Sequence, residues 1–399
     1  YFLKLLTGNY IPFLIIEWND QDKSILSSWL KGNFTENYVK KLHKKLSGYF
    51  GKEYMVTLTN SGRSAIYLAL KSLDLQNKAE VILPSYSCLG VIEPVLKAKL
   101  TPNLVDVDDD LNIEYDSVKK VINKNTKVII LPHLGGKFAK DTFKIINLAR
   151  KKKIFVIEDV TQSFGLLHNN KPAGLFGDFG VFSSGIGKTI FSCGGGWLIS
   201  KSQKSFQNIT LMEEKIDCIK HRIIKFKDSF SEKKIYRSLK KLNFILFYKI
   251  LLKRKIITTK KVKNFNLYKM NQIEAAFALS QINDINKLIK TRKANANKWL
   301  KLIKNYNLNY KIFDNTNVYN KLYINGKDSK FLNKKLTFSG IELESGYTPL
   351  HLNEKYKKYK KTLLPYTEKI WASTFSLPTR PSLNKRDWKM IEKSVLKQN

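Results

Sequence analysis

The sequence lacks the features that mark several large classes of protein. It holds only three cysteines, Cys88, Cys193 and Cys218, without a CxxC pair, which argues against a disulfide framework or a structural zinc site and favours a reducing, cytoplasmic setting. The five histidines form no HExxH pair, so that metal motif is absent. Apolar runs such as 244–248 are interrupted by lysine, far short of the roughly 18 residues that cross a bilayer. An integral helical membrane protein is therefore excluded.

Acidic residues are also scarce relative to basic ones. The chain has 71 Lys and Arg against 33 Asp and Glu, a formal net charge of +38. Such a charge attracts nucleic acid, anionic membranes or phosphorylated substrates. The many Lys, Asn and Ile residues also fit an AT-rich coding sequence, so composition alone does not name a partner. The apolar fraction of 43% over 399 residues is enough for a large core, and the length predicts two or three domains.

Short apolar runs alternate with amphipathic stretches from about residue 52. This alternation predicts an α/β domain with a mostly parallel sheet. The predicted buried strands are Glu80–Leu83, Asn103–Val107, Lys127–Leu131, Ile154–Ile157, Gly180–Phe182 and Gly196–Ile199. The predicted helices are Arg63–Ser72, Tyr115–Asn123, Lys140–Lys152, Gln272–Leu279 and Ile285–Ile303.

A strongly basic segment interrupts this pattern. Between Lys220 and Lys263 there are 16 Lys or Arg residues and two acids, and the stretch 235–257 interleaves apolar residues with lysine. It resembles a basic amphipathic helix or hairpin that lies on an anionic membrane, or an insertion that packs its apolar stripe on the protein itself. We therefore predict a large α/β domain over 1–218, a basic insertion over 219–264 and a smaller C-terminal α+β domain over 265–399.

Two loops hold the densest groups of polar and small residues. Asp159 ends a predicted strand, at the sheet edge where open α/β proteins bind ligands, and a buried carboxylate there needs a partner. Lys188 follows 29 residues later, in a loop whose small residues permit close approach of a ligand.

Two interpretations of these loops compete. The first is a P-loop, because 187–189 match the end of GxxxxGK[ST], but that motif requires glycine where the chain has Phe182. The second is a pyridoxal-phosphate site, which needs a lysine for a Schiff base, a carboxylate for the pyridine nitrogen and donors for phosphate. Lys188, Asp159 and the Ser183 loop supply all three, and the loop 59–64 precedes a helix whose first amides suit phosphate. The second interpretation accounts for more of the chain.

Several ordered motifs carry a resemblance to a known family. They are 60–65 (NSGRSA), 83–88 (LPSYSC), 132–136 (PHLGG), 157–159 (IED) with Gln162, Gly177-Asp178, Phe182-Ser183, Lys188, 193–196 (CGGG), 268–270 (YKM) with 274–276 (EAA), and 347–351 (YTPLH). With these motifs the chain resembles the DegT-like sugar aminotransferases from about residue 17 to its C-terminus. The resemblance implies the aspartate-aminotransferase-like, fold-type I architecture and pyridoxal 5'-phosphate as cofactor.

The resemblance also implies a role for each matching residue. Lys188 would form the Schiff base and move the proton between substrate carbon and cofactor, Asp159 would pair with the pyridinium nitrogen, and Gln162 would lie near the ring. The phosphate would be held by Ser183, Ser61, Gly62 and Arg63. Cys88 stands where the family often has an aromatic residue stacked on the ring, with Tyr86 as an alternative.

The chain departs from the family pattern at other positions. Arg63 stands where the family often has threonine, and Gly185 where many members have histidine. Leu267, with Asn266 beside it, takes the place of an asparagine that the neighbouring subunit usually lends. Family dehydratases replace the lysine with histidine, whereas this chain keeps Lys188, which favours transamination.

We therefore predict a cytoplasmic homodimer that moves an amino group, with glutamate as the donor, onto a nucleotide-linked keto-sugar for surface glycan or related biosynthesis. The segment 219–264 would allow peripheral contact with the inner membrane surface, and no specific nucleic acid is expected. The alternative is a non-catalytic regulatory or nucleic-acid-binding protein that retains the fold.

Overall fold

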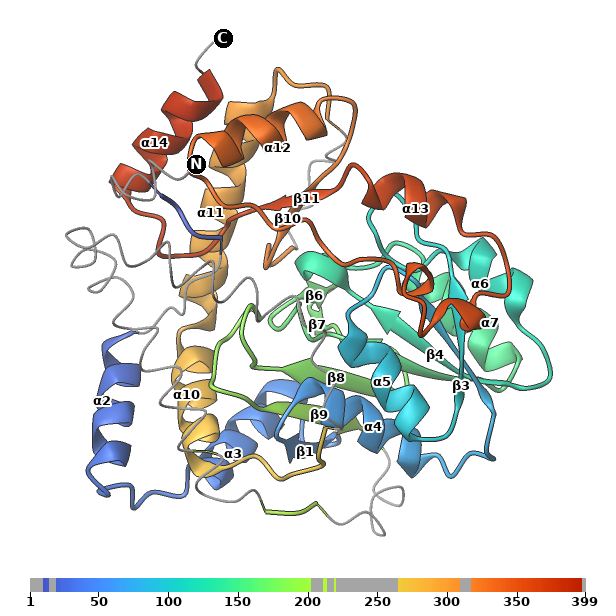
Figure 1. The fold of residues 1–399 in the computed structure, drawn as a ribbon. Coiled ribbons are helices and arrows are strands. Elements are labelled where there is room, and N and C mark those ends of the chain that lie inside the picture. The colour runs from blue at the N-terminus through green and yellow to red at the C-terminus, as the bar shows by residue number, and fades with distance from the viewer. Residues whose placement is uncertain are drawn as a thin grey trace.

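A seven-stranded sheet forms the centre of the molecule in the computed structural model, which describes residues 10–13, 19–201, 211–213, 219, 265–308 and 317–396 (Figure 1). The strand order is β1-β9-β8-β5-β4-β2-β3. The bounds are β1 Met55–Thr59, β2 Glu80–Pro84, β3 Thr101–Val105, β4 Thr126–Pro132, β5 Phe155–Asp159, β8 Phe179–Ser183 and β9 Gly196–Ser200. The five strands from β8 to β3 run parallel, β9 pairs antiparallel with β8, and β1 pairs antiparallel with β9.

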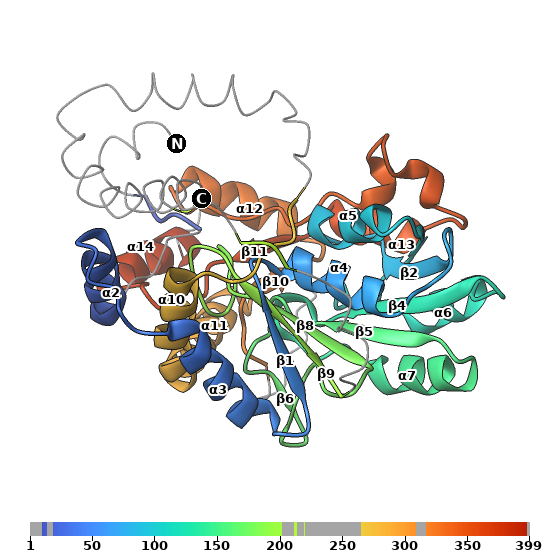
Figure 2. The same cartoon turned by 90° about the horizontal axis from the view of Figure 1, so that it is seen from below.

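Helices cover both faces of the sheet, and alternate side chains of β4 pack against the helices on opposite faces. Successive side chains of a strand point to opposite faces. Val128 and Ile130 pack into the core beneath α4 (Gly62–Ser72) and α5 (Leu89–Lys97). Ile129 and Leu131 pack on the other face, into the core beneath α6 (Tyr115–Val121) and α7 (Thr142–Lys151). Figure 2 shows the sheet between these two helical layers. A strand covered on both faces reads as a continuous apolar run.

The antiparallel edge of the sheet has its own core. Phe182 and Trp197 stack there with ring centroids 5.7 Å apart, against helices α3 (Tyr38–Phe50) and α10 (Gln272–Asn283). Helix α2 (Asp20–Leu30) packs on α10. Both α2 and α10 begin with a capping box, in which an asparagine side chain and an acid three residues later satisfy exposed backbone amides.

The C-terminal part packs around Trp299 and lies to one side of the sheet (Figure 1). It contains α11 (Ile285–Ile303), β10 (Leu322–Ile324), α12 (Ser329–Phe338), α13 (Pro365–Trp371), β11 (Phe375–Leu377) and α14 (Lys385–Leu396). β10 and β11 form a two-stranded antiparallel sheet. Two shorter strands, β6 (Leu167–His168) and β7 (Lys171–Pro172), form a separate hairpin.

The predicted elements are confirmed with shifted ends. Each of the six predicted strands overlaps an observed one, and the helix predicted over 285–303 begins and ends where expected. The sequence analysis missed β1, α2, α3 and α5. Helix α5 contains Pro94, a residue that usually ends or kinks a helix. The basic insertion lies outside the described residues except for Ile219, so the proposed domain limits at 218 and 264 stay predictions. Among the described helices, none combines the length and apolarity needed to cross a membrane.

Candidate active site

One cavity of about 300 Å³, here named the Lys188 cavity, lies at the carboxyl ends of β4, β5 and β8 and at the N-termini of α4 and α5. All eight predicted site residues line it: Ser61, Gly62, Arg63, Cys88, Asp159, Gln162, Ser183 and Lys188. Parallel strands place their carboxyl ends at the same edge of a sheet, which is where open α/β folds bind ligands. The tertiary structure thus brings together residues from separate motifs.

The N-terminus of α4 forms one end of the cavity. Ser61 caps the helix, and its Oγ accepts a hydrogen bond from the Ser64 amide at 3.1 Å. The other amides of the first turn have no acceptor within the helix, so they suit an anion such as phosphate. Gly62 is needed there because a Cβ at this position would lie 2.9 Å from the Cβ of Ser183. The close approach of α4 to β8 therefore depends on the missing side chain.

Arg63 lines the same end of the cavity, but its guanidinium already has a partner. An Arg63 Nη1 lies 3.0 Å from an oxygen of Glu93 on α5, a carboxylate side chain that is only 8% exposed. The guanidinium also lies over the ring of Phe265, 5.6 Å from its centroid. The ion pair ties the first turns of α4 and α5 together and keeps a positive charge beside the α4 amides.

Lys188 and Asp159 face the cavity from neighbouring loops. The Lys188 amine donates to Thr161 Oγ1 at 3.3 Å, and Asp159 Oδ1 accepts from the Thr161 amide at 3.0 Å. Burial lowers the pKa of the Lys188 amine below the 10.5 of an ordinary lysine, against the attraction of Asp159, which raises it. A larger fraction of the amine is therefore unprotonated and able to attack a carbonyl. Thr161, missed in the sequence analysis, lies two residues after Asp159.

Gln162 is held in one orientation by two hydrogen bonds. Its carbonyl oxygen accepts from the Gly135 amide at 3.0 Å, so its NH₂ donates to the hydroxyl of Tyr347 at 2.6 Å. Burial, followed by the nearby Cys88 and Glu344, raises the pKa of Tyr347 well above its usual value. Tyr347 thus keeps a proton that it can donate into the cavity. It belongs to a recognised motif, but only the fold shows that it reaches Gln162.

Cys88 and Tyr86 differ in their position relative to the cavity. Cys88 caps α5, where its Sγ accepts from the Gly90 amide at 3.4 Å, and it lines the cavity. Tyr86 is only 1% exposed and packs edge-on against Tyr347, with ring centroids 6.0 Å apart, but it is not among the lining residues. Of the two residues, only Cys88 lines the cavity, and its place beside a ligand ring stays a prediction.

A buried hydrogen bond between His133 and Glu158 lies beneath the wall of the cavity. His133 Nδ1 accepts from the Ala139 amide, so its Nε2 carries the proton that it donates to Glu158 at 2.9 Å. Burial alone would raise the pKa of Glu158, but hydrogen bonds from His133 and from the amides of Gly177 and Gly174 hold it below its ordinary value. Glu158 precedes Asp159 on β5, so this network fixes the strand end that presents Asp159.

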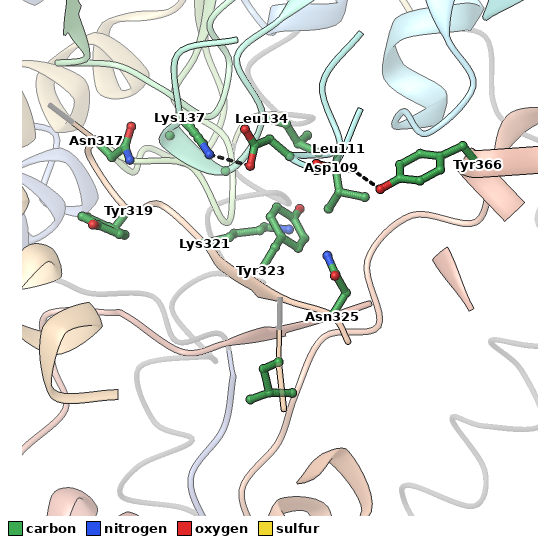
Figure 3. Close-up of a pocket in the computed structure, with 14 residues that line it drawn as sticks. Asp109, Leu111, Leu134, Lys137, Asn317, Tyr319, Lys321, Tyr323, Asn325 and Tyr366 are labelled. Carbon is green, nitrogen blue, oxygen red and sulfur yellow. Dashed lines mark hydrogen bonds and ion pairs between the residues drawn. The ribbon is translucent and has the colours of Figure 1, made fainter. Parts of the chain in front are cut away.

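A second cavity of about 410 Å³, here named the Tyr323 cavity, adjoins the first and shares Leu134 with it. It lies between β10 and the loops that follow β3 and β4 (Figure 3). Two contacts cross its upper wall: Lys137 pairs with Asp110 at 2.5 Å, and the Tyr366 hydroxyl donates to Asp109. The sequence analysis contained no prediction for this cavity.

The chain matches the DegT/DnrJ/EryC1/StrS aminotransferase family over residues 19–396. It is 29% identical to the GDP-perosamine synthase of Escherichia coli O157:H7 over 198 residues, 49% of this chain and 54% of that protein. It is 30% identical to the GDP-4-keto-6-deoxy-D-mannose 3-dehydratase of Yersinia pseudotuberculosis over 204 residues, 49% of this chain and 51% of that protein. The chain spans about half the length of these curated relatives.

The fold is that of solved members of the same class. NtdA from Bacillus subtilis, solved with bound cofactor PMP, superposes with a TM-score of 0.73 at 23% identity, covering 97% of this chain and 84% of that one. This likeness confirms the predicted fold-type I architecture. The match over 19–396 extends beyond the motifs to nearly the whole chain: the chain belongs to the DegT/DnrJ/EryC1/StrS aminotransferase family.

Proposed function

We propose that this protein is a pyridoxal-phosphate-dependent aminotransferase that converts a nucleotide-linked keto-sugar to an amino-sugar, with glutamate as amino donor. The observation that carries the proposal is the meeting of Lys188, Asp159 and the α4 N-terminus in one cavity. The cofactor, when bound, supplies the electron sink for amino transfer. Its three recognition points, an aldehyde, a pyridine nitrogen and a phosphate, match an amine, a carboxylate and a helix N-terminus.

The residues present fit this group in size and chemistry. Gly62 keeps the α4 amides open, because a Cβ would meet the Cβ of Ser183 at 2.9 Å, and Ser61 and Ser183 add hydroxyls to the same end of the cavity. Asp159 is only 7% exposed and would keep the ring nitrogen protonated from the far end. Cys88 would lie against the ring, and Gln162, fixed by Gly135, would face its edge.

The chain's own residues would perform the proton movements. The Lys188 amine, once freed by the amino donor, would take the proton from the substrate carbon and pass it to the cofactor. It would move the proton back in the same way for the second substrate. Its lowered pKa suits a base that works near neutrality. The Thr161 hydroxyl, 3.3 Å from the amine, would keep it directed into the cavity.

Family membership and intact site chemistry disfavour the non-catalytic alternative. The matched family is an aminotransferase family, and the relatives named above act on GDP-linked sugars by their names. One relative is a dehydratase. The lysine at 188, in place of the histidine expected of that class, supports transamination for this chain.

The cellular setting and assembly are part of the proposal. A protein with three scattered cysteines suits the cytoplasm, and its net charge of +38 would speed capture of an anionic nucleotide-sugar. The homodimer and the peripheral membrane contact through 219–264 rest on the sequence pattern and the resemblance.

The test is a visible spectrum of the purified protein with pyridoxal phosphate, before and after glutamate. We expect a yellow band that bleaches with glutamate, and borohydride trapping should fix the adduct on Lys188, identified by peptide mapping. A colourless protein without an adduct at Lys188 would overturn the proposal.

A further inference from the structure

Helix α12 exposes two phenylalanines to solvent on the side that faces away from its core residues. Leu332 and Leu336 are fully buried, whereas Phe331 is 50% exposed and Phe338 69% exposed. The two phenylalanines are seven residues apart, which is close to two turns of helix, so they lie on one stripe along it. Apolar surface that stays in water costs free energy, and where it gathers on one face it marks a contact site.

The end of α14 extends this apolar stripe. Helices α12 and α14 pack against each other, above β10 and β11 in Figure 1. The Lys335 amine donates to the Tyr306 hydroxyl and to a backbone carbonyl in the last turn of α14, both at 3.1 Å, and Leu396 in that turn is 65% exposed. The Tyr306 ring lies 6.4 Å from the Phe331 ring, between centroids, so Tyr306 links the stripe to α14. Phe331, Phe338 and Leu396 are here named the α12 patch.

Basic residues surround the α12 patch. Lys330 and Lys334 alternate with the two phenylalanines on the solvent face of the helix, and neither forms an ion pair with another described residue. Six bases and one acid are the exposed charged residues of α12 and α14: Lys330, Lys334, Lys385, Arg386, Lys389, Lys393 and Glu392. Charge of one sign at this end of the molecule favours a partner of the opposite charge.

An anionic membrane surface fits this combination of side chains. Lysines beside exposed phenylalanines on a helix are typical of helices that lie in a membrane interface, where the rings enter the acyl boundary and the amines meet anionic headgroups. A second copy of the patch, or the insertion with its 16 basic residues and two acids, would bring charge of the same sign. A nucleic acid strand stacks successive bases on neighbouring rings, whereas Phe331 and Phe338 are about 10 Å apart along the helix axis.

We propose that the α12 patch is a docking surface for an anionic membrane, with its phenylalanines in the lipid interface and its lysines at the headgroups. This surface is separate from the segment 219–264, for which the sequence predicts membrane contact, and adds a second contact to it. None of the residues of the patch lines the Lys188 cavity. The inference is therefore independent of the amino-transfer chemistry.

The test is sedimentation of the full chain with vesicles of phosphatidylcholine and phosphatidylglycerol. Wild type should bind these vesicles and bind vesicles of phosphatidylcholine alone much more weakly. The double variant Phe331→Gln with Phe338→Gln should weaken binding about tenfold or more, because two rings no longer leave water. The double variant Lys330→Gln with Lys334→Gln should weaken it about thirtyfold, and what binding remains should depend less on salt.

Matched controls change the same residue types elsewhere in the chain. Phe155→Gln alters an exposed ring at the start of β5. Lys40→Gln with Lys44→Gln removes another exposed pair four residues apart, on α3. Both controls should bind the vesicles as wild type does. The two α12 variants should keep the wild-type melting temperature and bleach normally with glutamate, so a loss of vesicle binding is separable from unfolding and from failure of the proposed function.

Three results would overturn the inference. The first is a wild-type protein that binds neither kind of vesicle. The second is wild-type affinity in both α12 variants, which would assign membrane contact to another surface such as the basic insertion. The third is loss of binding to a single-stranded oligonucleotide in the phenylalanine variant with vesicle binding unchanged, which would assign the patch to nucleic acid.

Discussion

The Lys188 cavity and the Tyr323 cavity lie side by side but are built in opposite ways. In the first, the polar groups hold one another: Gln162 donates to Tyr347, Lys188 to Thr161, and Arg63 pairs with Glu93. In the second, two buried polar groups lack a partner among the described residues. The first cavity is therefore held in one arrangement by contacts between its own residues, which suits a resident group.

The largest expected effect is at the reacting amine. Lys188→Ala should slow bleaching by glutamate on the order of 1,000-fold or more, because the variant lacks both the attachment point and the base. Single-turnover absorbance measures this rate. Lys144→Ala removes a lysine whose side chain is 69% exposed and should match wild type. Wild-type bleaching in Lys188→Ala would contradict the role given to this cavity.

Gly135→Ala tests the loop that separates the two cavities and orients Gln162. Gly135 has a φ of +68°, and an added Cβ would lie 3.0 Å from the Tyr323 ring. We expect a loss of about 1–3 kcal/mol in the free energy of unfolding, measured by urea titration, with slower bleaching by glutamate because the loop orients Gln162. Gly32→Ala is the matched control, since Gly32 has a φ of +77° but open space around it. Bleaching at the wild-type rate in Gly135→Ala would show that the loop does not orient Gln162.

The Arg63–Glu93 pair extends the comparison, because it is a partly buried ion pair at the rim of the Lys188 cavity. Arg63→Thr should weaken binding of pyridoxal phosphate about tenfold, through loss of a charge beside the phosphate. Binding of pyridoxal, which has no phosphate, should not change. Arg150→Thr, at an exposed position, serves as the control.

The same pair separates affinity from stability. Arg63→Thr leaves the buried Glu93 carboxylate without its charge partner, so the melting temperature should fall. Adding Glu93→Gln should restore part of the stability while cofactor affinity stays weak. Equal loss of affinity for pyridoxal and pyridoxal phosphate would instead mean that Arg63 only supports the helices.

The smallest expected effect is on the titration of Lys188 in the cofactor-free protein. Burial lowers its pKa and Asp159 raises it, so its reactivity should level off below pH 10.5, and Asp159→Asn should move the midpoint lower still. Competitive acetylation with peptide mapping measures this. Asp116→Asn, which removes an exposed carboxylate on α6, should leave the midpoint in place. A higher titration midpoint of Lys188 in Asp159→Asn would show that the Asp159 carboxylate does not raise the pKa of the Lys188 amine.

The sequence alone determined the α/β alternation and the contents of the Lys188 cavity. Buried strands can be recognised in the sequence as apolar runs, such as Ile129 to Leu131, because helices cover both faces of the sheet. Lys188, Asp159 and the Ser61 turn could be found because each lies in a local motif at a strand end or helix start. The sequence analysis missed the edge strand β1 and helix α5, because a strand at the sheet edge and a helix with an internal proline have weak local sequence signals.

Only the tertiary structure decided how these motifs combine. In the folded chain Arg63 pairs with Glu93, and Cys88 rather than Tyr86 lines the cavity. Tyr347 accepts a hydrogen bond from Gln162, which lies 185 positions away in the sequence. The tertiary structure also created the Tyr323 cavity from the loops after β3 and β4, β10 and Tyr366. Such contacts depend on how elements far apart in the sequence pack together, and a local pattern of residue types does not specify that packing.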